Sequence, residues 1–190
     1  MKEHRRDCVL YVTATCNLKC IYCYIDKSPI LMQIDKMLED SYKGDYYFDF
    51  MKEMFYQDNL QKIEFWGGEP TYGLCRAFPT LHKAIQYFPN LHEFYFSTNL
   101  TTETCVSDII NFLSLLGQYP ERRFQVGLQL SLDGPQYIND FNRGVGTTEK
   151  FTKNFSKLIC DLRPFLEQHA NIQINANFKP TLDIKAIAQL

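Results

Sequence analysis

The chain has 190 residues, of which 45% are hydrophobic and 15% aromatic, so it is long enough for one domain with a sizeable core. Its formal net charge of −2 predicts no basic surface for nucleic acid or an anionic membrane, and no apolar window is long enough to cross a bilayer. Three of its seven cysteines lie too close together for a secreted disulfide framework, so we expect a cytoplasmic protein.

The first predicted element is a strand at residues 9–12, and the loop after it contains Cys16, Cys20 and Cys23. Thiolates bind zinc and iron–sulfur clusters, and a folded loop can turn three of them toward one point. A closed structural zinc site needs four protein ligands, whereas a [4Fe–4S] cluster held by three cysteines leaves one iron open for chemistry. Zinc and three reduced core thiols remain the alternatives at this point.

The segment after the cysteine loop, residues 25–44, has no dependable period, and we interpret it as a long connection or lid with a helical turn near residues 36–41. Asp45 is the predicted N-cap of the next helix, Gly117 a predicted C-cap, and Pro164 a predicted helix breaker. Further strands are predicted at residues 62–66, 93–97, 124–132 and 172–178, and helices at 47–55, 81–88, 106–116 and 151–162, with another helix starting after Pro180.

This alternation of strands and helices predicts an α/β fold with a parallel sheet and its functional loops at the carboxyl ends of the strands. Three polar motifs lie at such ends. They are Gly67-Gly68-Glu69-Pro70, the Ser97-Thr98-Asn99 segment, and Ser131-Leu132-Asp133-Gly134-Pro135 followed by Arg143. The paired glycines allow a ligand to approach the backbone, Glu69 can accept hydrogen bonds from an ammonium group, and Arg143 can bind a carboxylate. Each motif is also compatible with an ordinary turn.

The spacing of the cysteines, with Tyr22 just before the last one, together with Gly67-Gly68-Glu69-Pro70, resembles the radical S-adenosylmethionine (SAM) enzymes. The resemblance implies that Cys16, Cys20 and Cys23 hold a [4Fe–4S] cluster whose open iron is chelated by SAM. An electron from the cluster would then cleave SAM to a 5'-deoxyadenosyl radical. It also implies that Gly67 to Pro70 bind the amino group of SAM and that Tyr22 lies against the adenine.

The segment from Ser131 to Arg143 resembles the corresponding segment of sulfatase maturases and other peptide-modifying radical SAM enzymes. The resemblance implies that Ser131 and Arg143 help to hold SAM, and we place Asp133, Ser97 and Asn99 in the same cofactor site. Two positions depart from the family pattern. Leu100 stands where a glycine is common, and Asn139 stands where a histidine is usual, so no catalytic role is assigned there.

The resemblance implies an incomplete (β/α)6 barrel with about five βα units, in which residues 1–190 form the core domain. Relatives continue into a cysteine-rich SPASM or twitch region that is missing here, so we expect a truncated chain, a split gene product or a minimal enzyme. The implied reaction is hydrogen abstraction from a peptide or protein side chain, with a flavodoxin or ferredoxin as electron donor. The alternatives are a small activase, a small-molecule tailoring enzyme, or a non-catalytic metal-binding interaction module.

Overall fold

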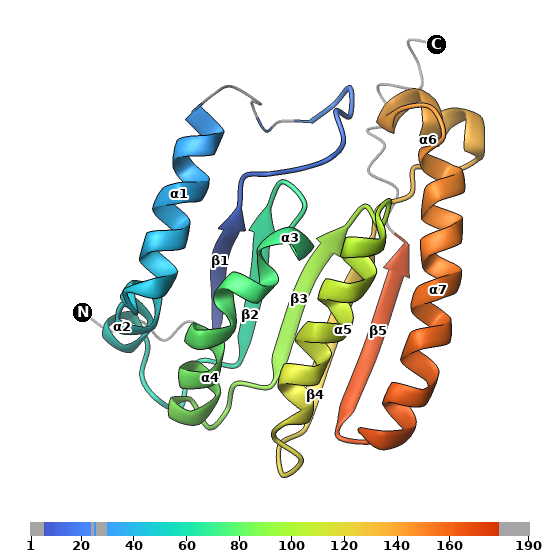
Figure 1. Ribbon diagram of the computed structural model, residues 1–190. Coiled ribbons are helices and arrows are strands. Elements are labelled where there is room, and N and C mark those ends of the chain that lie inside the picture. The colour runs from blue at the N-terminus through green and yellow to red at the C-terminus, as the bar shows by residue number, and fades with distance from the viewer. Residues whose placement is uncertain (1–5, 24, 26–29, 179–190) are drawn as a thin grey trace.

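A five-stranded parallel sheet organises the computed structural model, which describes residues 6–23, 25 and 30–178 (Figure 1). The elements in chain order are β1 (Asp7–Thr13), α1 (Ile30–Lys43), α2 (Tyr46–Met54), β2 (Lys62–Gly67), α3 (Thr71–Leu74), a 3-10 turn (Cys75–Ala77), α4 (Phe78–Tyr87), β3 (Glu93–Thr98), α5 (Glu103–Gly117), β4 (Phe124–Leu130), α6 (Gln136–Arg143), α7 (Thr147–Gln168) and β5 (Ile172–Phe178). The helix predicted after Pro180 lies outside the described residues.

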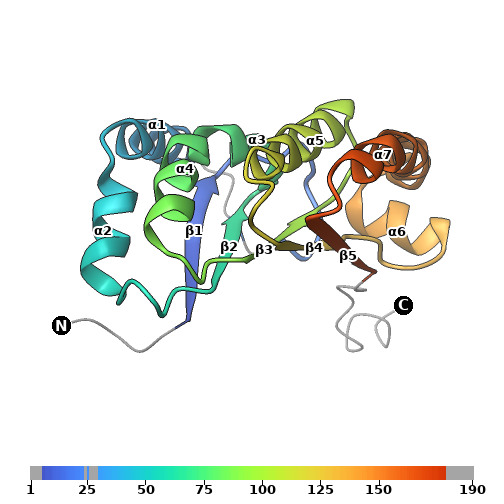
Figure 2. The same ribbon diagram turned by 90° about the horizontal axis from the view of Figure 1, so that it is seen from below.

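The strands lie in the order β1-β2-β3-β4-β5, and every neighbouring pair is parallel. Helices α1, α3, α4, α5 and α7 lie on one side of the sheet, and the described residues form no helix layer on the opposite side (Figure 2). The predicted α/β class is therefore confirmed, and one open sheet of five parallel strands is consistent with a partial radical SAM barrel. All five predicted strands form, although β4 ends at Leu130, two residues earlier than expected.

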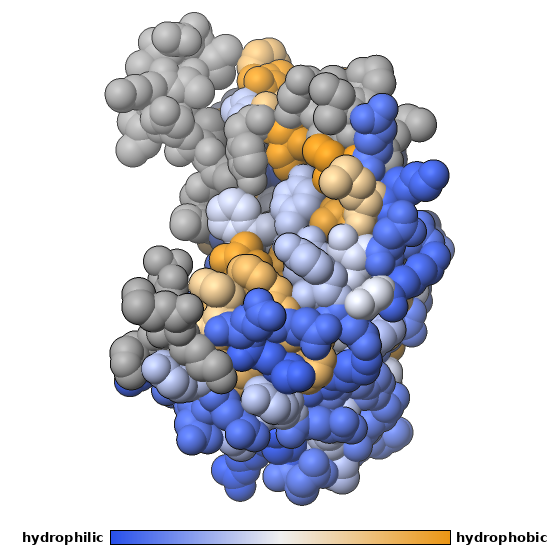
Figure 3. Space-filling model, turned by 90° about the vertical axis from the view of Figure 1, so that its left-hand side faces the viewer, coloured by the Kyte–Doolittle hydropathy of each residue, from blue (hydrophilic) through white to orange (hydrophobic). Residues whose placement is uncertain are grey.

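The side of the molecule that carries α1 and α2 is unevenly polar. Hydrophilic side chains dominate its lower part, and hydrophobic ones gather toward the upper part, the end at which the strands finish (Figure 3). Among the described helices, none combines the length and the apolar character that crossing a bilayer requires.

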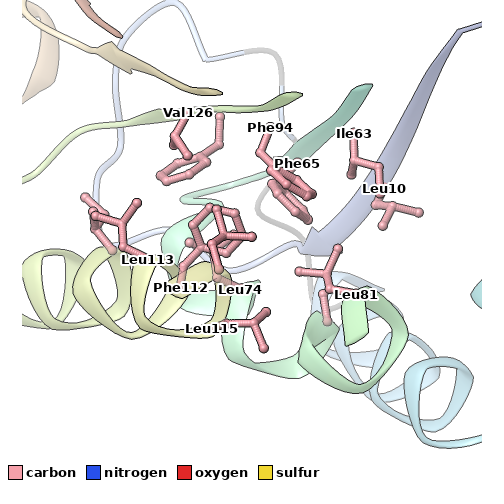
Figure 4. Packing of buried hydrophobic residues seen from close by; sticks show 14 of the residues in the cluster. Leu10, Ile63, Phe65, Leu74, Leu81, Phe94, Phe112, Leu113, Leu115 and Val126 are labelled. Atoms are coloured by element: carbon pink, nitrogen blue, oxygen red, sulfur yellow. The ribbon is translucent and has the colours of Figure 1, made fainter. Parts of the chain in front are cut away.

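The core lies between the sheet and its helix layer. Alternate strand residues point toward the helices, so that Phe65 of β2 and Phe94 of β3 meet Phe112 of α5 (Figure 4). The Phe112 ring lies 5.6 Å from that of Phe65 and 5.5 Å from that of Phe94, both edge-on. Each fully buried phenylalanine stabilises the fold by about 1.5–3 kcal/mol. This packing fixes the strands whose ends carry the polar motifs.

Helix α1 replaces most of the predicted connection at residues 25–44. Leu38 and Tyr42 are buried one turn apart, and Asp35 accepts hydrogen bonds from Thr13 Oγ1 at 2.9 Å, Ala14 N at 3.0 Å and Thr15 Oγ1 at 2.6 Å. Arg76 Nη1 completes the arrangement, 3.1 Å from Asp35 Oδ1. These contacts lower the pKa of Asp35 against the opposing effect of its burial. The prediction of an irregular connection was wrong, because tertiary hydrogen bonds stabilise a helix that local propensity does not reveal.

Of three predictions about helix ends, the one for Pro164 was wrong, whereas those for Gly117 and Asp45 were right in position but not in the reason for the residue. Pro164 lies inside α7, which continues to Gln168. Gly117 is the last residue of α5 and has no positive φ. A Cβ there would come within 2.7 Å of the His169 ring, so close packing accounts for the glycine. Asp45 precedes α2 as expected but makes no side-chain cap, since its carboxylate pairs with Lys83 instead.

Candidate active site

A cavity of about 200 Å³ lies at the carboxyl ends of the strands. Its lining comes from the loop after β1, the ends of β2, β3 and β4, and helix α6. The lining residues are Cys16, Leu18, Cys20, Tyr22, Cys23, Ile25, Gly67, Gly68, Glu69, Pro70, Ser97, Thr98, Asn99, Ser131 and Arg143. Every residue predicted to bind a cofactor or metal is among them except Asp133. The structure thus brings together motifs that are far apart in the sequence, because parallel strands end at one edge of the sheet.

The cysteine loop reaches this cavity by crossing over the ends of the strands (Figure 1). Ile21 N donates a 2.9 Å hydrogen bond to Asn142 O in α6, which attaches the tip of the loop to the far side of the site. Within the loop, Cys23 N donates to Cys20 O at 3.0 Å, and Leu18 N to Cys16 Sγ at 3.4 Å. These bonds orient the loop so that all three cysteines line the cavity.

The three thiols share the cavity without forming a mononuclear site. In the described part of the chain, no three His, Cys, Asp or Glu side chains are gathered around a position for one metal ion. A closed structural zinc site would need a fourth protein ligand beside these three cysteines. In a four-iron cluster each cysteine binds a different iron, so the sulfurs need not converge on one point. The donor set and its placement fit a [4Fe–4S] cluster.

Gly67 and Gly68 lie where the end of β2 packs directly against the backbone at the start of the cysteine loop. A Cβ on Gly67 would lie 2.1 Å from Thr13 O, and one on Gly68 would lie 2.5 Å from Thr15 O. Gly68 N donates a hydrogen bond to Thr13 O at 2.9 Å, and Glu69 N donates one to Thr15 O at 2.8 Å. Any side chain here would therefore push the cysteine loop away from the sheet. We predicted these glycines from the approach of a ligand, and the structure adds this backbone contact.

Glu69 is a buried carboxylate, only 1% exposed, in the wall of the cavity. Its Oε2 accepts a 2.7 Å hydrogen bond from Asn99 N, and its Oε1 accepts one of 2.9 Å from Thr71 Oγ1. Burial raises the pKa of Glu69 despite these bonds. A cationic group in the cavity would offset the cost of burying this charge, which fits the ammonium group predicted to bind here.

Asn99 links the end of β3 to the cysteine loop. Its Nδ2 lies 3.0 Å from Asn17 Oδ1 and 3.8 Å from Cys16 Sγ. The following residue, Leu100, is fully buried and has a φ of 50°, in the left-handed region that favours glycine. Leu100 therefore adopts a conformation that a glycine would adopt without strain, at a cost of about 1–3 kcal/mol.

Asp133 lies behind the cavity wall and contacts two residues that line it. Its Oδ1 is 2.7 Å from Arg143 Nη2, and its Oδ2 accepts a 2.8 Å hydrogen bond from the Tyr22 hydroxyl. The Arg143 guanidinium lies 5.6 Å from the centroid of the Tyr22 ring, as a cation–π pair. The backbone N–H of Asp133 donates to Asn139 Oδ1 at 3.1 Å, so Asn139 has a structural role.

Several residues of the site were missed by sequence reasoning. Leu18, Ile25 and Thr98 line the cavity, and Asn17 contacts Asn99. None of them has a distinctive pattern, because each is placed by the fold of its neighbours. Thr98 is the exception, because it belongs to the polar Ser97-Thr98-Asn99 segment already predicted at a strand end, although no cofactor contact was assigned to it.

The Radical SAM superfamily profile matches residues 10–159, which span the cysteine loop, the cavity and most of α7. No curated protein sequence matches the chain. Native anSMEcpe with bound AdoMet, a solved structure, is similar over 90% of this chain and 43% of its own, with 24% identity and a TM-score of 0.50. The structure of histidine-tagged anSMEcpe with bound AdoMet is similar over 90% and 41%, with 23% identity and a TM-score of 0.49.

The first of these likenesses concerns the fold alone, and this chain spans less than half the length of either solved chain. The superfamily match covers far more than half of the present sequence and includes each motif that lines the cavity. The chain therefore belongs to the radical SAM superfamily.

Proposed function

We propose that this chain is the core domain of an enzyme that binds a [4Fe–4S] cluster and SAM and abstracts a hydrogen from a peptide or protein side chain. One observation carries the proposal. The three cysteines line the same cavity as Glu69, Asn99 and Arg143, although up to 127 positions separate them (143 − 16). When bound, the cluster would supply the electron that cleaves SAM reductively.

The protein side chains have separate parts in this proposal. Cys16, Cys20 and Cys23 would ligate the cluster, and Glu69 would accept hydrogen bonds from the SAM ammonium group. Arg143 would bind the SAM carboxylate with the help of Ser131, while Tyr22 would lie against the adenine. The remaining cofactor contacts would come from Gly67, Gly68, Pro70, Ser97 and Asn99, with Asp133 acting on Arg143 from behind.

The charge distribution in the cavity supports these roles. A buried carboxylate, Glu69, and a buried guanidinium, Arg143, lie in the same cavity wall. An amino acid moiety presents an ammonium and a carboxylate, so it could pair with both residues at once.

Anaerobic reconstitution with iron and sulfide tests the proposed activity. We expect about four irons per chain, brown absorbance, and reductive cleavage of SAM to 5'-deoxyadenosine when dithionite is added. A peptide substrate and a flavodoxin or ferredoxin donor would then be sought by coupled turnover. Bound zinc without SAM cleavage would contradict the proposal and favour a non-catalytic metal-binding module.

A small activase or a small-molecule tailoring enzyme is the second candidate. It shares the cysteine loop and the SAM site, so cofactor assays cannot separate it from a peptide-modifying enzyme. The segment from Ser131 to Arg143 favours the peptide-modifying type by its resemblance to that group. Substrate-dependent formation of 5'-deoxyadenosine with peptides, and not with free small molecules, would separate the two.

A further inference from the structure

A second cavity, of about 160 Å³, adjoins the first. It is lined by Phe65, Trp66, Gly67, Tyr95, Ser97 and Gln129. Gly67 and Ser97 line both cavities, so the two are continuous along the ends of β2 and β3. Trp66 and Tyr95 alternate with core phenylalanines in their strands, so they face away from the helix layer, on the uncovered side of the sheet (Figure 2).

The uncovered side of the sheet carries its residues in rows set by the strand register. Ser97 pairs with Gln129, and Gln129 with Asn177, so the row nearest the strand ends is uncharged. The row at the other end of the strands pairs Lys62 with Glu93. On this side of the sheet, the paired residues at the beginnings of the strands are therefore charged, and those beside the cofactor cavity are uncharged.

The second cavity offers hydrogen-bonding groups in a fixed arrangement. The Tyr95 hydroxyl donates to Gln129 Oε1 at 2.5 Å, which leaves the Gln129 Nε2 donor on the opposite side of the amide. The Tyr95 ring lies against Gly127, where a Cβ would come within 2.6 Å of it, so the tyrosine is held in place. Within the described part of the chain, neither Gln129 Nε2 nor the Ser97 hydroxyl has a hydrogen-bond partner.

No residue that lines this cavity is charged. The Lys62 ammonium lies 5.2 Å from the centroid of the Tyr95 ring, but it is also 2.5 Å from Glu64 and 3.9 Å from Glu93, so one lysine is shared by two carboxylates. An anionic group in the cavity would lose water without gaining a cation and would lie near excess negative charge. An uncharged group that accepts hydrogen bonds would meet the available donors at no such cost.

We propose that this second cavity is a specificity subsite that receives an uncharged, hydrogen-bonding side chain of a peptide substrate. The proposal rests on the function proposed above and names which residue of the substrate the enzyme selects. A cavity of about 150 Å³ accommodates benzene, so the subsite has room for one side chain of that size. The half-exposed indole of Trp66, 49% accessible, offers a flat surface for the planar amide groups of the peptide.

The fluorescence of Trp66 can be used to measure peptide binding, because Trp66 is the single tryptophan of the chain. The reconstituted protein with SAM bound is titrated, without oxygen, with capped pentapeptide pools whose central residue is either Asn or its charged isostere Asp. The flanking residues are randomised among uncharged amino acids. We expect the Asn pool to protect Trp66 fluorescence from acrylamide quenching, with an apparent Kd at least about tenfold lower than that of the Asp pool.

Two matched variants keep the test specific. Gln129→Leu removes the donor in the cavity, and Gln125→Leu makes the same change on the same strand and face, outside the cavity lining. We expect Gln129→Leu to weaken binding of the Asn pool about threefold to tenfold and Gln125→Leu to leave it unchanged. Both variants should cleave SAM without substrate at the wild-type rate, since neither residue lines the cofactor cavity.

The possible failures are distinguishable. Equal affinity for the Asn and Asp pools, equal effects of the two variants, or no protection by either pool would overturn the subsite while SAM cleavage still supports the proposed function. A tryptophan already shielded from acrylamide before peptide is added would mean that a second copy of the chain covers this face, which also overturns the subsite. Failure to bind iron or to cleave SAM would instead overturn the proposed function.

Discussion

The Tyr22 hydroxyl donates a 2.8 Å hydrogen bond to Asp133 Oδ2 and so ties the cysteine loop to the segment after β4. Tyr22 lies between the second and third cysteines, and Asp133 also pairs with Arg143. The position of the cysteine loop and that of Arg143 are therefore set by one buried carboxylate.

Tyr22→Phe should loosen the loop without changing its apolar contacts. The variant removes one donor from a buried carboxylate, which costs about 1–3 kcal/mol in the free energy of unfolding. Urea denaturation of the metal-free protein measures the change. Tyr137→Phe is the matched control, because Tyr137 is 74% exposed and should contribute nothing measurable. Equal stability of the two variants would contradict a role for the Tyr22 bond.

Asp133→Asn should be more destabilising than the loss of any surface ion pair. It leaves the buried guanidinium of Arg143 without its counter-ion, and breaking a buried pair costs about 3–5 kcal/mol. Glu103→Gln breaks the exposed Lys153–Glu103 pair and should have no measurable effect. Thermal unfolding of both variants compares them, and a similar Tm for the two would show that the Asp133–Arg143 pair is not buried as described.

Glu69→Gln should weaken SAM binding at least about tenfold, because a charged hydrogen bond to an ammonium contributes about 1.5–3 kcal/mol. The amide oxygen of Gln can accept the bond from Asn99 N, and its NH₂ group can donate to Thr71 Oγ1, so the fold should persist. Calorimetric titration of the reconstituted variant with SAM measures the affinity. Glu93→Gln, at the beginning of β3, is the control and should bind SAM normally. Unchanged affinity in Glu69→Gln would remove Glu69 from the SAM site.

Asp140 makes the stability of the α6–α7 region dependent on pH. Its Oδ1 accepts hydrogen bonds from Thr148 N at 2.8 Å and Thr148 Oγ1 at 2.7 Å, and its Oδ2 accepts one from Gly146 N at 3.1 Å. These bonds hold the pKa of Asp140 well below its usual range. The folded-state pKa is lowered, so the stabilisation is complete above the unfolded-state value near 3.9 and is lost as the pH falls below it.

Asp140→Asn should therefore lose less stability than the wild type between about pH 5 and pH 2, because its side chain does not titrate. The Tm measured across this range gives the comparison. Parallel pH profiles for the two proteins would show that another carboxylate causes the acid sensitivity.

Local patterns were sufficient to predict the strands and the motifs at their ends. Residues 172–178 alternate as a strand should, and β5 has those bounds. Since parallel strands end together, the prediction that their polar ends meet followed from the fold class alone. Glu69, Asn99 and Ser131 line one cavity in the structure.

The contacts between segments that are far apart in the chain could not be predicted from the sequence. Asp35 in α1 holds Thr13 and Thr15, but nothing in residues 25–44 indicates that partner. Asp133 was predicted to belong to the SAM site, but the sequence does not show that its carboxylate pairs with Arg143. Helix α6 was not predicted either, because its position follows from hydrogen bonds with the cysteine loop and with the start of α7. Such long-range pairings have no local signature.

The central claim is that Cys16, Cys20 and Cys23 together hold one four-iron cluster. Its most direct test is the iron content of Cys20→Ala after anaerobic reconstitution, compared with Cys160→Ala, whose cysteine is exposed on α7 and outside the cavity. We expect Cys160→Ala to bind about four irons per chain and to cleave SAM, and Cys20→Ala to do neither. Equal iron content and equal SAM cleavage in the two variants would contradict the account.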